Sequence, residues 1–412
     1  MPDPSKPASR VVIAGGGIAA LEALLAIRSL AGPRVAIDLL APDREFAYRP
    51  RAVLEPFRLG ERRRYPLGAI AEGNGATYHR DALASVDTVA HTARTLGGRE
   101  LLYDALVVAT GARATTPLPS AVTFTDQEPE LFAQALDRLR SGDARTLAFV
   151  VPPGTAWTLP LYELALITSY EVRELTLTLI TPEEEPLGVF GRRAAEAARR
   201  LLRERAIDLK TASYAEESAV NAHDGAPALI LRPGGERLRF DCVVALPRIT
   251  GSSIDGLPAD AAGFIPVDHH GRILGAGDCY AAGDATSFPV KQGGIAAQQA
   301  DAAAEVIAAA AGAPVEPREF RPILRGLLLT SSEPRYLRAA ISGGQGETSI
   351  SSSHFLWWPS TKVAGRFLAP YLAGIDASTE TAIDPGAPEV IPIDLELRDF
   401  RSDLVIEGLE GT

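Results

Sequence analysis

The run Val11-Val12-Ile13-Ala14-Gly15-Gly16-Gly17-Ile18-Ala19-Ala20 decides the fold of this chain. Its first four residues are typical of a buried strand, residues 21–30 continue with an apolar helical pattern, and a second strand is predicted at 35–40. This order predicts the strand, glycine turn, helix and strand of a dinucleotide-binding unit. We expect Gly15 to allow the tight turn and Gly17 to let the backbone approach a pyrophosphate at the helix N-terminus. Ala20 stands in the place of the third glycine.

The acidic residue that usually ends the second strand of such a unit, where it binds a ribose hydroxyl, is missing here. The strand ends in Leu40-Ala41-Pro42, and Asp38 lies inside it. Asp43 and Glu45, just past the strand, are the alternatives. We expect Ala41 and Asp43 to line the cofactor.

The composition is that of an ordinary globular protein. Its 412 residues allow two or three domains, and 46% are hydrophobic and 23% charged. The formal net charge of -11 argues against a nucleic-acid partner, because binding phosphates requires a basic face. Arg62-Arg63-Arg64 is interpreted as a solvated loop, with docking of an anionic partner as the alternative. The sequence shows no signal peptide and no spanning helix, so we expect a cytoplasmic protein.

The two cysteines, Cys242 and Cys279, stand 37 positions apart and form neither a C-x-x-C pair nor a zinc-ligand spacing. We interpret Cys242 as a small buried hydrophobe and favour the same for Cys279, with a thiol near reacting groups as the alternative. The sequence argues against disulfide-based redox chemistry and predicts no metal site.

A second unit of the same type is predicted from the apolar run 146–151 and from a faint repeat between residues 37–45 and 177–185. Where a phosphate loop should follow, the chain reads Pro152-Pro153-Gly154-Thr155-Ala156-Trp157. Prolines lack N–H donors for a pyrophosphate, and the indole would obstruct close approach of the backbone. We interpret this as a duplicated fold without its ligand site. NAD(P)H binding there is the alternative, in which the carboxylates of residues 183–185 would favour NADH.

Two further motifs end predicted strands. Residues 103–113 contain a buried-strand pattern that ends in Ala109-Thr110-Gly111, whose glycine permits a sharp exit near a cofactor. Tyr280-Ala281-Ala282-Gly283-Asp284 places a carboxylate where it can accept hydrogen bonds from cofactor hydroxyls. Residues 291–295 then begin an alanine-rich helix, whose N-terminus can approach a ring carbonyl that becomes negative on reduction. Lys291 would add a positive charge, with a solvated lysine as the alternative.

The last ninety residues have a different composition. Residues 323–330 and 336–342 are strand-like, and a Gly/Ser-rich loop is predicted at 342–353. The adjacent Trp357 and Trp358 would wall a cofactor face or an apolar pocket, or close the core between domains.

Residues 363–372 are a candidate for an interfacial membrane helix, which Gly365 and Pro370 disfavour. Peripheral membrane contact is therefore not favoured. The acidic tail 375–412, with strand-like patches such as 390–393, is expected to pack on the domain or on a second subunit, so a homodimer is left open.

The ordered motifs resemble FAD flavoproteins of the pyridine nucleotide-disulfide oxidoreductase superfamily, most similar to its sulfide:quinone oxidoreductase and type II NADH dehydrogenase branch. The resemblance extends from residue 11 to about residue 312 and also includes Phe46-Ala47-Tyr48-Arg49-Pro50. It implies bound FAD, with the glycine turn at the pyrophosphate, Asp284 at ribityl or phosphate-side oxygens, and the residues from Lys291 beside the isoalloxazine. The predicted cofactor-binding residues are Gly15, Gly17, Ile18, Ala19, Ala20, Ala41, Asp43, Arg49, Pro50, Ala109, Thr110, Gly111, Gly283, Asp284, Lys291, Gln292, Gly293, Gly294 and Ile295.

Two departures from that branch matter for activity. Sulfide oxidation there uses cysteine sulfurs beside the flavin, and none stand in matching positions. NADH oxidation uses a glycine loop that Pro152-Pro153-Gly154 replaces. The resemblance therefore implies the FAD platform without either named activity.

We expect an α/β fold with two Rossmann-like dinucleotide-binding domains, glutathione-reductase-like, and a small C-terminal α+β domain. The FAD-binding domain is expected at 1–118 and 250–320, the second Rossmann-like domain at 119–249, and the C-terminal interface domain at 321–412.

The expected function is that of an FAD-dependent oxidoreductase that passes electrons or hydride from an unidentified donor through flavin N5 to a small acceptor, with a quinone as one candidate. The alternatives are a non-catalytic FAD-binding sensor or assembly module, and an NADH-dependent quinone reductase with an atypical nucleotide loop. Tyr162, Trp357, Trp358 and Lys291 are the candidates for lining the reacting face. The six histidines have no evident partners.

Overall fold

The glycine turn joins the central strand of a five-stranded parallel sheet to the helix that follows it, as the sequence predicts. Strand β1 (Ser9–Ala14) lies at its centre, in the order β20-β9-β1-β2-β5. Strand β20 (Cys279–Ala281) pairs in parallel with β9, so the downstream motif adds a strand to the sheet that begins at residue 9. The other strands are β2 (Val35–Leu40), β5 (Ala76–His79) and β9 (Ala105–Val108).

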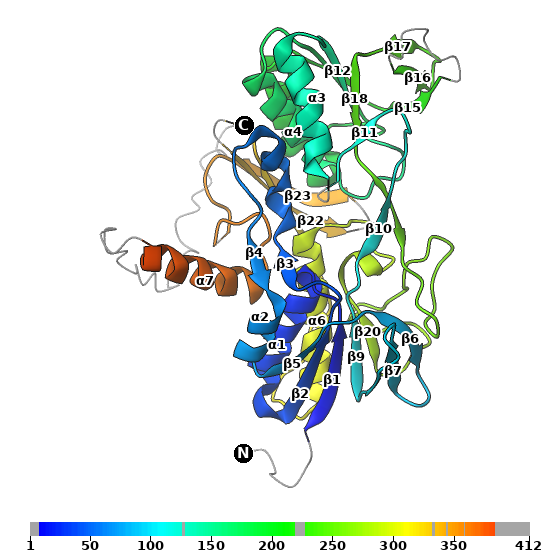
Figure 1. The fold of residues 1–412 in the computed structure, drawn as a ribbon, viewed down its shortest axis with the longest axis vertical. Coiled ribbons are helices and arrows are strands. Elements are labelled where there is room, and N and C mark those ends of the chain that lie inside the picture. Colours follow the sequence, from blue (N-terminus) through cyan, green and yellow to red (C-terminus); the bar gives the residue numbers. More distant parts are fainter. Residues whose placement is uncertain are drawn as a thin grey trace, which may run out of the picture. The chain divides into compact units, whose positions relative to one another are not determined.

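Helices α1 (Ile18–Ala31) and α6 (Gly293–Ala310) pack against each other beside this sheet (Figure 1). Alanines are buried along both helices, among them Ala20 in α1 and Ala297 in α6. Because small side chains let two helices approach closely, this composition brings the starts of α1 and α6 together. Short elements complete the domain: η1 (Gly32–Arg34), β3 (Glu45–Ala47), η2 (Arg49–Phe57), β4 (Arg64–Pro66), α2 (Leu67–Gly73), β6 (Leu83–Asp87), β7 (Thr92–Thr95), β8 (Glu100–Leu102) and η4 (Gly283–Ala285).

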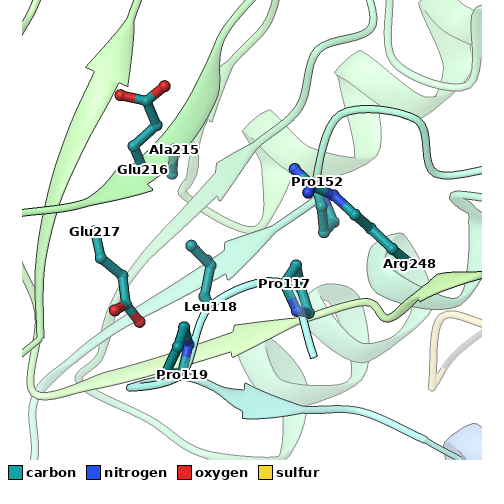
Figure 2. A pocket seen from close by; sticks show the side chains of 8 residues that line it. All are labelled: Pro117, Leu118, Pro119, Pro152, Ala215, Glu216, Glu217 and Arg248. Atoms are coloured by element: carbon teal, nitrogen blue, oxygen red, sulfur yellow. The ribbon is translucent and has the colours of Figure 1, made fainter. Parts of the chain in front are cut away.

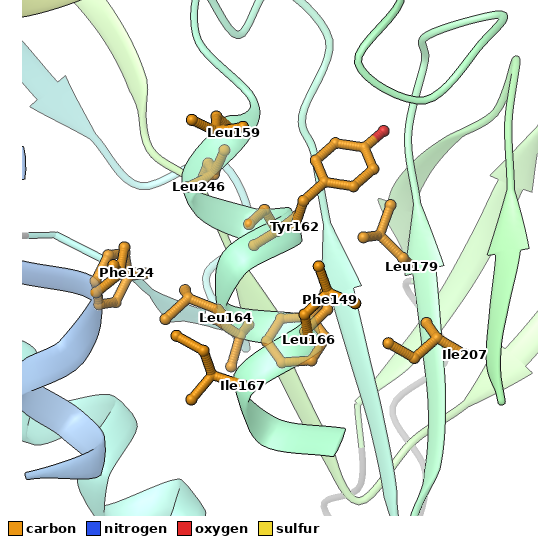
Figure 3. Close-up of a cluster of buried hydrophobic side chains, with 14 of the residues drawn as sticks. Phe124, Phe149, Leu159, Tyr162, Leu164, Leu166, Ile167, Leu179, Ile207 and Leu246 are labelled. Carbon is orange, nitrogen blue, oxygen red and sulfur yellow. The ribbon is translucent and has the colours of Figure 1, made fainter. Parts of the chain in front are cut away.

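A second parallel sheet has the order β11-β18-β12-β13-β14. Its core includes Phe149 of the sheet and Leu164 and Ile167 of helix α4, which are fully buried (Figure 3). The duplicated Rossmann-like fold is thereby confirmed. Its elements are β11 (Val122–Thr123), α3 (Pro129–Ser141), β12 (Thr146–Val150), α4 (Leu159–Glu171), β13 (Thr176–Ile180), η3 (Gly188–Phe190), α5 (Arg192–Glu204), β14 (Ile207–Lys210) and β18 (Cys242–Ala245), with a three-stranded sheet of β15 (Tyr214–Glu217), β16 (Ala228–Arg232) and β17 (Arg237–Arg239).

The chain passes between the two sheets through one antiparallel pair of strands. Strand β10 (Ala112–Thr115) leads toward the second sheet, and β19 (Arg248–Gly251) returns from it. The domain boundaries expected from the sequence stay predictions.

After α6, strands β21 (Ile323–Leu328), β22 (Arg335–Ser342) and β23 (Gln345–Ser352) form an antiparallel sheet. The loop predicted at residues 342–353 is therefore wrong over most of its length. Glycine and serine are poor strand formers, but the backbone groups of β22 need partners, and β23 supplies them.

Helix α7 runs from Leu368 to Ile383, so it begins five residues later than the candidate helix at residues 363–372 and extends further. Residues 375–383, at the start of the acidic tail, are helical, which the sequence pattern did not indicate. The strand-like patch predicted at residues 390–393 lies outside the described part of the chain. No helix among the described residues is long and apolar enough to cross a membrane.

The computed structural model describes residues 8–125, 128–218, 227–331, 334–342, 345–357 and 359–383. Residues 1–371 form one compact unit, and residues 372–412 belong to a second.

Candidate functional site

Gly15 fixes the turn after β1. Its φ is +139°, which an L side chain rarely adopts, and a Cβ there would overlap the carbonyl oxygen of Ala109. The Ala-Thr-Gly motif therefore lies directly against the glycine turn. At Gly17, by contrast, an added Cβ would meet no atom within 4 Å. This open space lies at the N-terminus of α1, where unpaired N–H groups favour a phosphate.

Gly283 and Gly293 bring the downstream motifs onto the start of α1. A Cβ at Gly283 would lie 3.1 Å from the Cβ of Ala19, and one at Gly293 would lie 2.7 Å from Cδ1 of Ile18. Two helix N-termini, those of α1 and α6, consequently lie in one place. We call this group the glycine cradle: residues 15–20, 109–111, 283–284 and 291–295.

Gln292 caps α6. Its Oε1 accepts the N–H of Ile295 at 3.0 Å, and its Nε2 donates to the carbonyl of Arg325 at 3.2 Å. The side chain that was predicted to contact the cofactor is thus engaged in orienting the helix start.

Asp284 and Lys291 place charge in the glycine cradle. Burial raises the pKa of the Asp284 carboxyl, although Lys291 and Arg49 favour its ionised form. Among the described residues, Asp284 makes no direct side-chain hydrogen bond or ion pair, so its carboxylate remains for a ligand. Arg49 is exposed at the start of η2, followed by the partly exposed Pro50.

The ammonium of Lys291 turns back into the protein. Nζ donates to the carbonyls of Asp284, at 3.3 Å, and Thr286, and it lies 3.9 Å from the centre of the Phe264 ring. Burial lowers the pKa of Lys291 to about 8, against the opposing effect of Asp284. The interpretation of Lys291 as a solvated lysine is wrong, since only 9% of the residue is exposed.

Residues 361–368 cross the glycine cradle, and we call them the strap. A Cβ at Gly293 would lie 2.8 Å from Val363, whose N–H donates to the Tyr48 hydroxyl at 3.1 Å. The Tyr-Arg-Pro motif, the start of α6 and the strap therefore meet. At the other end of the strap, the carboxylate of Glu22 accepts the N–H groups of Phe367 and Leu368.

An ion pair fixes the strap to the second Rossmann-like domain. Lys362 Nζ lies 2.6 Å from both carboxylate oxygens of Glu163, which also accepts the N–H of Leu329 at 2.9 Å. Burial lowers the pKa of Lys362 and raises that of Glu163, and their mutual attraction opposes both shifts.

Sequence reasoning missed Glu22 and Glu163. Each is a charged residue within an otherwise apolar helical run, 18–27 and 159–167. Such isolated charges, which are expensive to bury without a partner, were the available signal.

Tyr162 does not belong to the glycine cradle. It is fully buried in the core around α4 (Figure 3), and its hydroxyl donates to Glu183 Oε2 at 2.6 Å. Glu183 also accepts hydrogen bonds from the hydroxyls of Thr158 and Thr181. Of the three carboxylates at 183–185 that were expected to favour NADH, Glu183 is thus engaged by three internal hydroxyls, which orient it inward.

The indole of Trp157, in the loop that replaces the second phosphate loop, packs against η3. The rings of Trp157 and Phe190 meet edge to face, with centroids 5.7 Å apart. A cavity of about 190 Å³ near this loop is lined by Pro152 and by Arg248, whose side chain runs toward Pro152 (Figure 2). None of the predicted site residues lines it, so it is distinct from the glycine cradle.

Of the two adjacent tryptophans, the structure describes Trp357. Trp357 donates to the carbonyl of Thr361 at 2.8 Å, and its ring centre lies 5.1 Å from that of Tyr336, so it supports the strap. Trp358 lies outside the described residues.

Ala41 is buried beside the glycine turn, 3.0 Å from where a Cβ of Gly16 would stand, whereas Asp43 is exposed. Asp38 faces elsewhere: its Oδ1 lies 2.6 Å from Nε2 of His79. The view that the histidines lack partners is therefore wrong for His79, because β2 and β5 place it beside Asp38.

Both thiols are buried. Burial raises the pKa of Cys242 and of Cys279, and the latter sulfur lies 3.3 Å from the Tyr103 hydroxyl. Raised thiol pKa values disfavour the thiolate that redox chemistry needs.

Comparison with known proteins agrees with this geometry. The family profile of the pyridine nucleotide-disulphide oxidoreductases matches residues 9–305. A sulfide-quinone reductase of Aquifex aeolicus (strain VF5) is 28% identical over 208 residues, which are 47% of this chain and 48% of that protein. The chain thus aligns with about half the length of this curated relative.

Solved structures share the fold. The sulfide:quinone oxidoreductase of the hyperthermophilic bacterium Aquifex aeolicus has a TM-score of 0.74 at 20% identity, covering 84% of this chain and 87% of that one. A ferredoxin reductase of the CYP199A2 system from Rhodopseudomonas palustris has a TM-score of 0.62 at 18% identity, covering 81% and 83%. With a family match over most of its length and two parallel sheets joined by the expected motifs, the chain belongs to the pyridine nucleotide-disulphide oxidoreductase family.

Proposed function

We propose that this chain is an FAD-dependent oxidoreductase that transfers electrons from a donor other than NAD(P)H to a small acceptor, a quinone. The observation that carries the proposal is the meeting of two glycine-lined helix N-termini in one cradle, with open space at Gly17 and an unengaged carboxylate at Asp284. FAD has groups that suit both parts of the cradle: a pyrophosphate for the N-terminus of α1, and ribityl hydroxyls for Asp284.

The residues of the glycine cradle fit FAD in type. The N-terminus of α1, open at Gly17, would hold the pyrophosphate. Asp284 would accept hydrogen bonds from ribityl hydroxyls, and the start of α6 would face the ring system. At Gly111, whose φ is +75°, an added Cβ would also meet nothing within 4 Å, so the backbone there is accessible to a ligand.

Bound FAD would supply a group that accepts a hydride or electrons and returns them singly or in pairs. The chain's own part is electrostatic. The N-terminus of α6 favours negative charge near it, and Lys291 carries a positive charge at pH 7 because its pKa, though lowered, is about 8. The strap covers the start of α6 through Val363 and thereby limits access of water from that side.

Contacts within the second Rossmann-like domain support the proposal that the donor is not NAD(P)H. Glu183, one of the carboxylates expected to favour NADH, is engaged by Tyr162, Thr158 and Thr181, and Trp157 packs onto Phe190 where a phosphate loop would be. A nicotinamide cofactor would have to break these contacts. The buried thiols likewise support chemistry without a cysteine redox centre.

The choice of a quinone as acceptor rests on likeness to a relative named as a sulfide-quinone reductase. Cytoplasmic localisation and a homodimer stay predictions.

The test begins with the purified protein. We expect it to carry flavin absorbance, and to lose it in Gly17→Val, because the new side chain fills space that the protein leaves open. Gly277→Ala, where a Cβ also meets nothing within 4 Å, is the matched control and should retain the cofactor. A wild-type protein that stays colourless after incubation with FAD would refute the proposal.

Anaerobic titration with NADH, NADPH, sulfide and reduced quinols then identifies the donor by bleaching of the flavin band. Rapid bleaching by NADH would contradict the assignment of the second domain. A flavin that no donor reduces and, once photoreduced, no quinone reoxidises would indicate a structural FAD module instead.

A further inference from the structure

Two arginines lie side by side on the C-terminal antiparallel sheet. Arg325 of β21 is directly opposite Arg338 of β22, so both side chains lie on one face of the sheet. Both residues are partly buried. Like charges at opposed positions destabilise a strand pair, and the partial burial of two cations adds a desolvation cost. A negative charge between them would offset both effects.

The described part of the chain does not supply that charge. Among the described residues, neither guanidinium makes a hydrogen bond or an ion pair. Burial lowers the pKa of Arg325 and the charge of Arg338 lowers it further, with no opposing acidic group among the residues that the structure describes. Lys362 shows the contrast, because its buried ammonium is paired with Glu163. The two guanidinium groups are therefore available to an anion from solution.

The arginine pair lies on the face of the sheet that points away from the second Rossmann-like domain. The opposite face is packed, since Leu324 belongs to the core around α4 and a Cβ at Gly326 would overlap the ring of Phe190. Side chains alternate between the two faces along a strand, which places Arg325 on the other side from these residues.

Apolar side chains border the arginine pair. Ile350 of β23 is directly opposite Arg338 and is 38% exposed. The next residue on this face of β22 is Tyr336, whose ring centre lies 5.7 Å from that of Phe355, and Phe355 is 67% exposed. A ligand that uses this whole surface has a negative group for the guanidiniums and an apolar body for Ile350 and Phe355. An organic carboxylate suits it, because the guanidinium fork matches its two oxygens.

Helix α6 connects the arginine pair to the glycine cradle. Gln292, which caps this helix, donates Nε2 to the carbonyl of Arg325 at 3.2 Å. Gln298 of the same helix bonds both backbone groups of Ile323, at 2.9 Å each. Side chains of α6 thus take the place of a neighbouring strand along β21. One glutamine side chain separates the backbone of Arg325 from the first turn of α6, where the ring system of FAD would lie.

We propose that Arg325 and Arg338 bind the carboxylate of a small organic acid whose apolar body lies against Ile350 and Phe355, and that this acid is a substrate of the enzyme. The role as substrate rests on the proposed function, whereas the binding itself does not require FAD. The partial burial of both arginines favours a small ligand over a membrane surface, which would contact protruding groups.

Calorimetric titration of the purified protein tests the binding, with benzoate as the probe. Benzyl alcohol, which lacks the charge, and inorganic phosphate, which lacks the apolar body, are the comparison ligands. We expect benzoate to bind, and Arg325→Gln and Arg338→Gln each to weaken it about tenfold or more, because each removes a charge-assisted hydrogen bond. Both comparison ligands should bind more weakly than benzoate.

The matched control is Arg237→Gln, which removes an exposed arginine from another antiparallel strand, β17, and should leave benzoate affinity unchanged. The proposal is overturned if benzoate does not bind, if neither variant of the arginine pair weakens it, or if phosphate or benzyl alcohol binds equally well.

Urea unfolding separates loss of binding from loss of fold. Without ligand, Arg325→Gln and Arg338→Gln should be at least as stable as the wild type, because each relieves a like-charge contact. Benzoate should raise the unfolding midpoint of the wild type and of Arg237→Gln, but not that of the other two variants. A large loss of stability in both arginine variants would show that the folded chain already compensates the pair, and would contradict the proposal.

Measurement with and without FAD separates this inference from the proposed function. Benzoate binding by a chain that never takes up FAD would sink the function and keep the carboxylate site, whereas FAD binding without benzoate binding would do the reverse. In the FAD-loaded protein, benzoate should also shift the flavin absorption band, and an unchanged band would refute the role as substrate. Sedimentation with phosphatidylglycerol vesicles that both arginine variants abolish would reassign the surface to a membrane and overturn the proposal.

Discussion

Replacing Glu163 by glutamine tests whether the strap is fastened to the second Rossmann-like domain by a buried charge pair. The side chains of Glu163 and Lys362 are 0% and 9% exposed, and the ammonium lies 2.6 Å from both oxygens. Removing one member of such a pair leaves the other charge buried without compensation. The typical loss of stability is about 3–5 kcal/mol.

Glutamine is chosen because it removes the negative charge of residue 163 and keeps an oxygen that accepts hydrogen bonds. Its carbonyl oxygen can still accept the N–H of Leu329, which avoids the further loss of about 1–3 kcal/mol for an unpaired backbone donor. We expect Glu163→Gln and Lys362→Met each to lose about 3–5 kcal/mol at pH 7. The double variant should lose much less than their sum, because no buried charge remains.

Urea unfolding followed by tryptophan fluorescence gives these differences, and hydrogen exchange at Leu329 reports the local site where unfolding is not two-state. The exposed pair Arg94–Glu100, at 61% and 56% exposure, is the matched control, and Arg94→Gln should cost less than about 1 kcal/mol. Single losses below about 1 kcal/mol, or an additive double variant, would refute the reasoning.

Two further predictions concern the titrating and sulfur-bearing groups. Burial lowers the pKa of Lys291 to about 8, so folding disfavours its charged form. The unfolding free energy of the wild-type chain should therefore increase relative to that of Lys291→Met as pH rises from about 8 to about 10. A difference that stays constant over this range in urea unfolding would contradict the lowered pKa. Both thiols are buried with raised pKa values, so the variant Cys242→Ala/Cys279→Ala should bind FAD and be reduced by the same donor at the wild-type rate, and loss of reduction with flavin still bound would show that a thiol takes part in electron transfer.

The first sheet and its glycine turn were predictable because their signals are local. An apolar run, Gly15 and an alanine-rich helix fix β1 and α1, and the prediction of a strand at 35–40 agrees with the bounds of β2. In the second sheet, β12 was predictable from the apolar run 146–151 and β13 from the faint repeat at 177–185, and Pro152 already argued against a phosphate loop there. Strand β23 was not readable, because glycine and serine form a strand there only by pairing with β22.

The sequence by itself determined the family, the two Rossmann-like folds and the glycines that form the cradle, since each follows from spacing within a few turns of chain. Only the tertiary structure decided which polar groups meet across hundreds of residues. It places Glu22 on Phe367, Glu163 on Lys362 and Glu183 on Tyr162. Side-chain partners depend on how helices pack, and a buried charge in a helical run indicates that a partner exists without indicating where in the chain it lies.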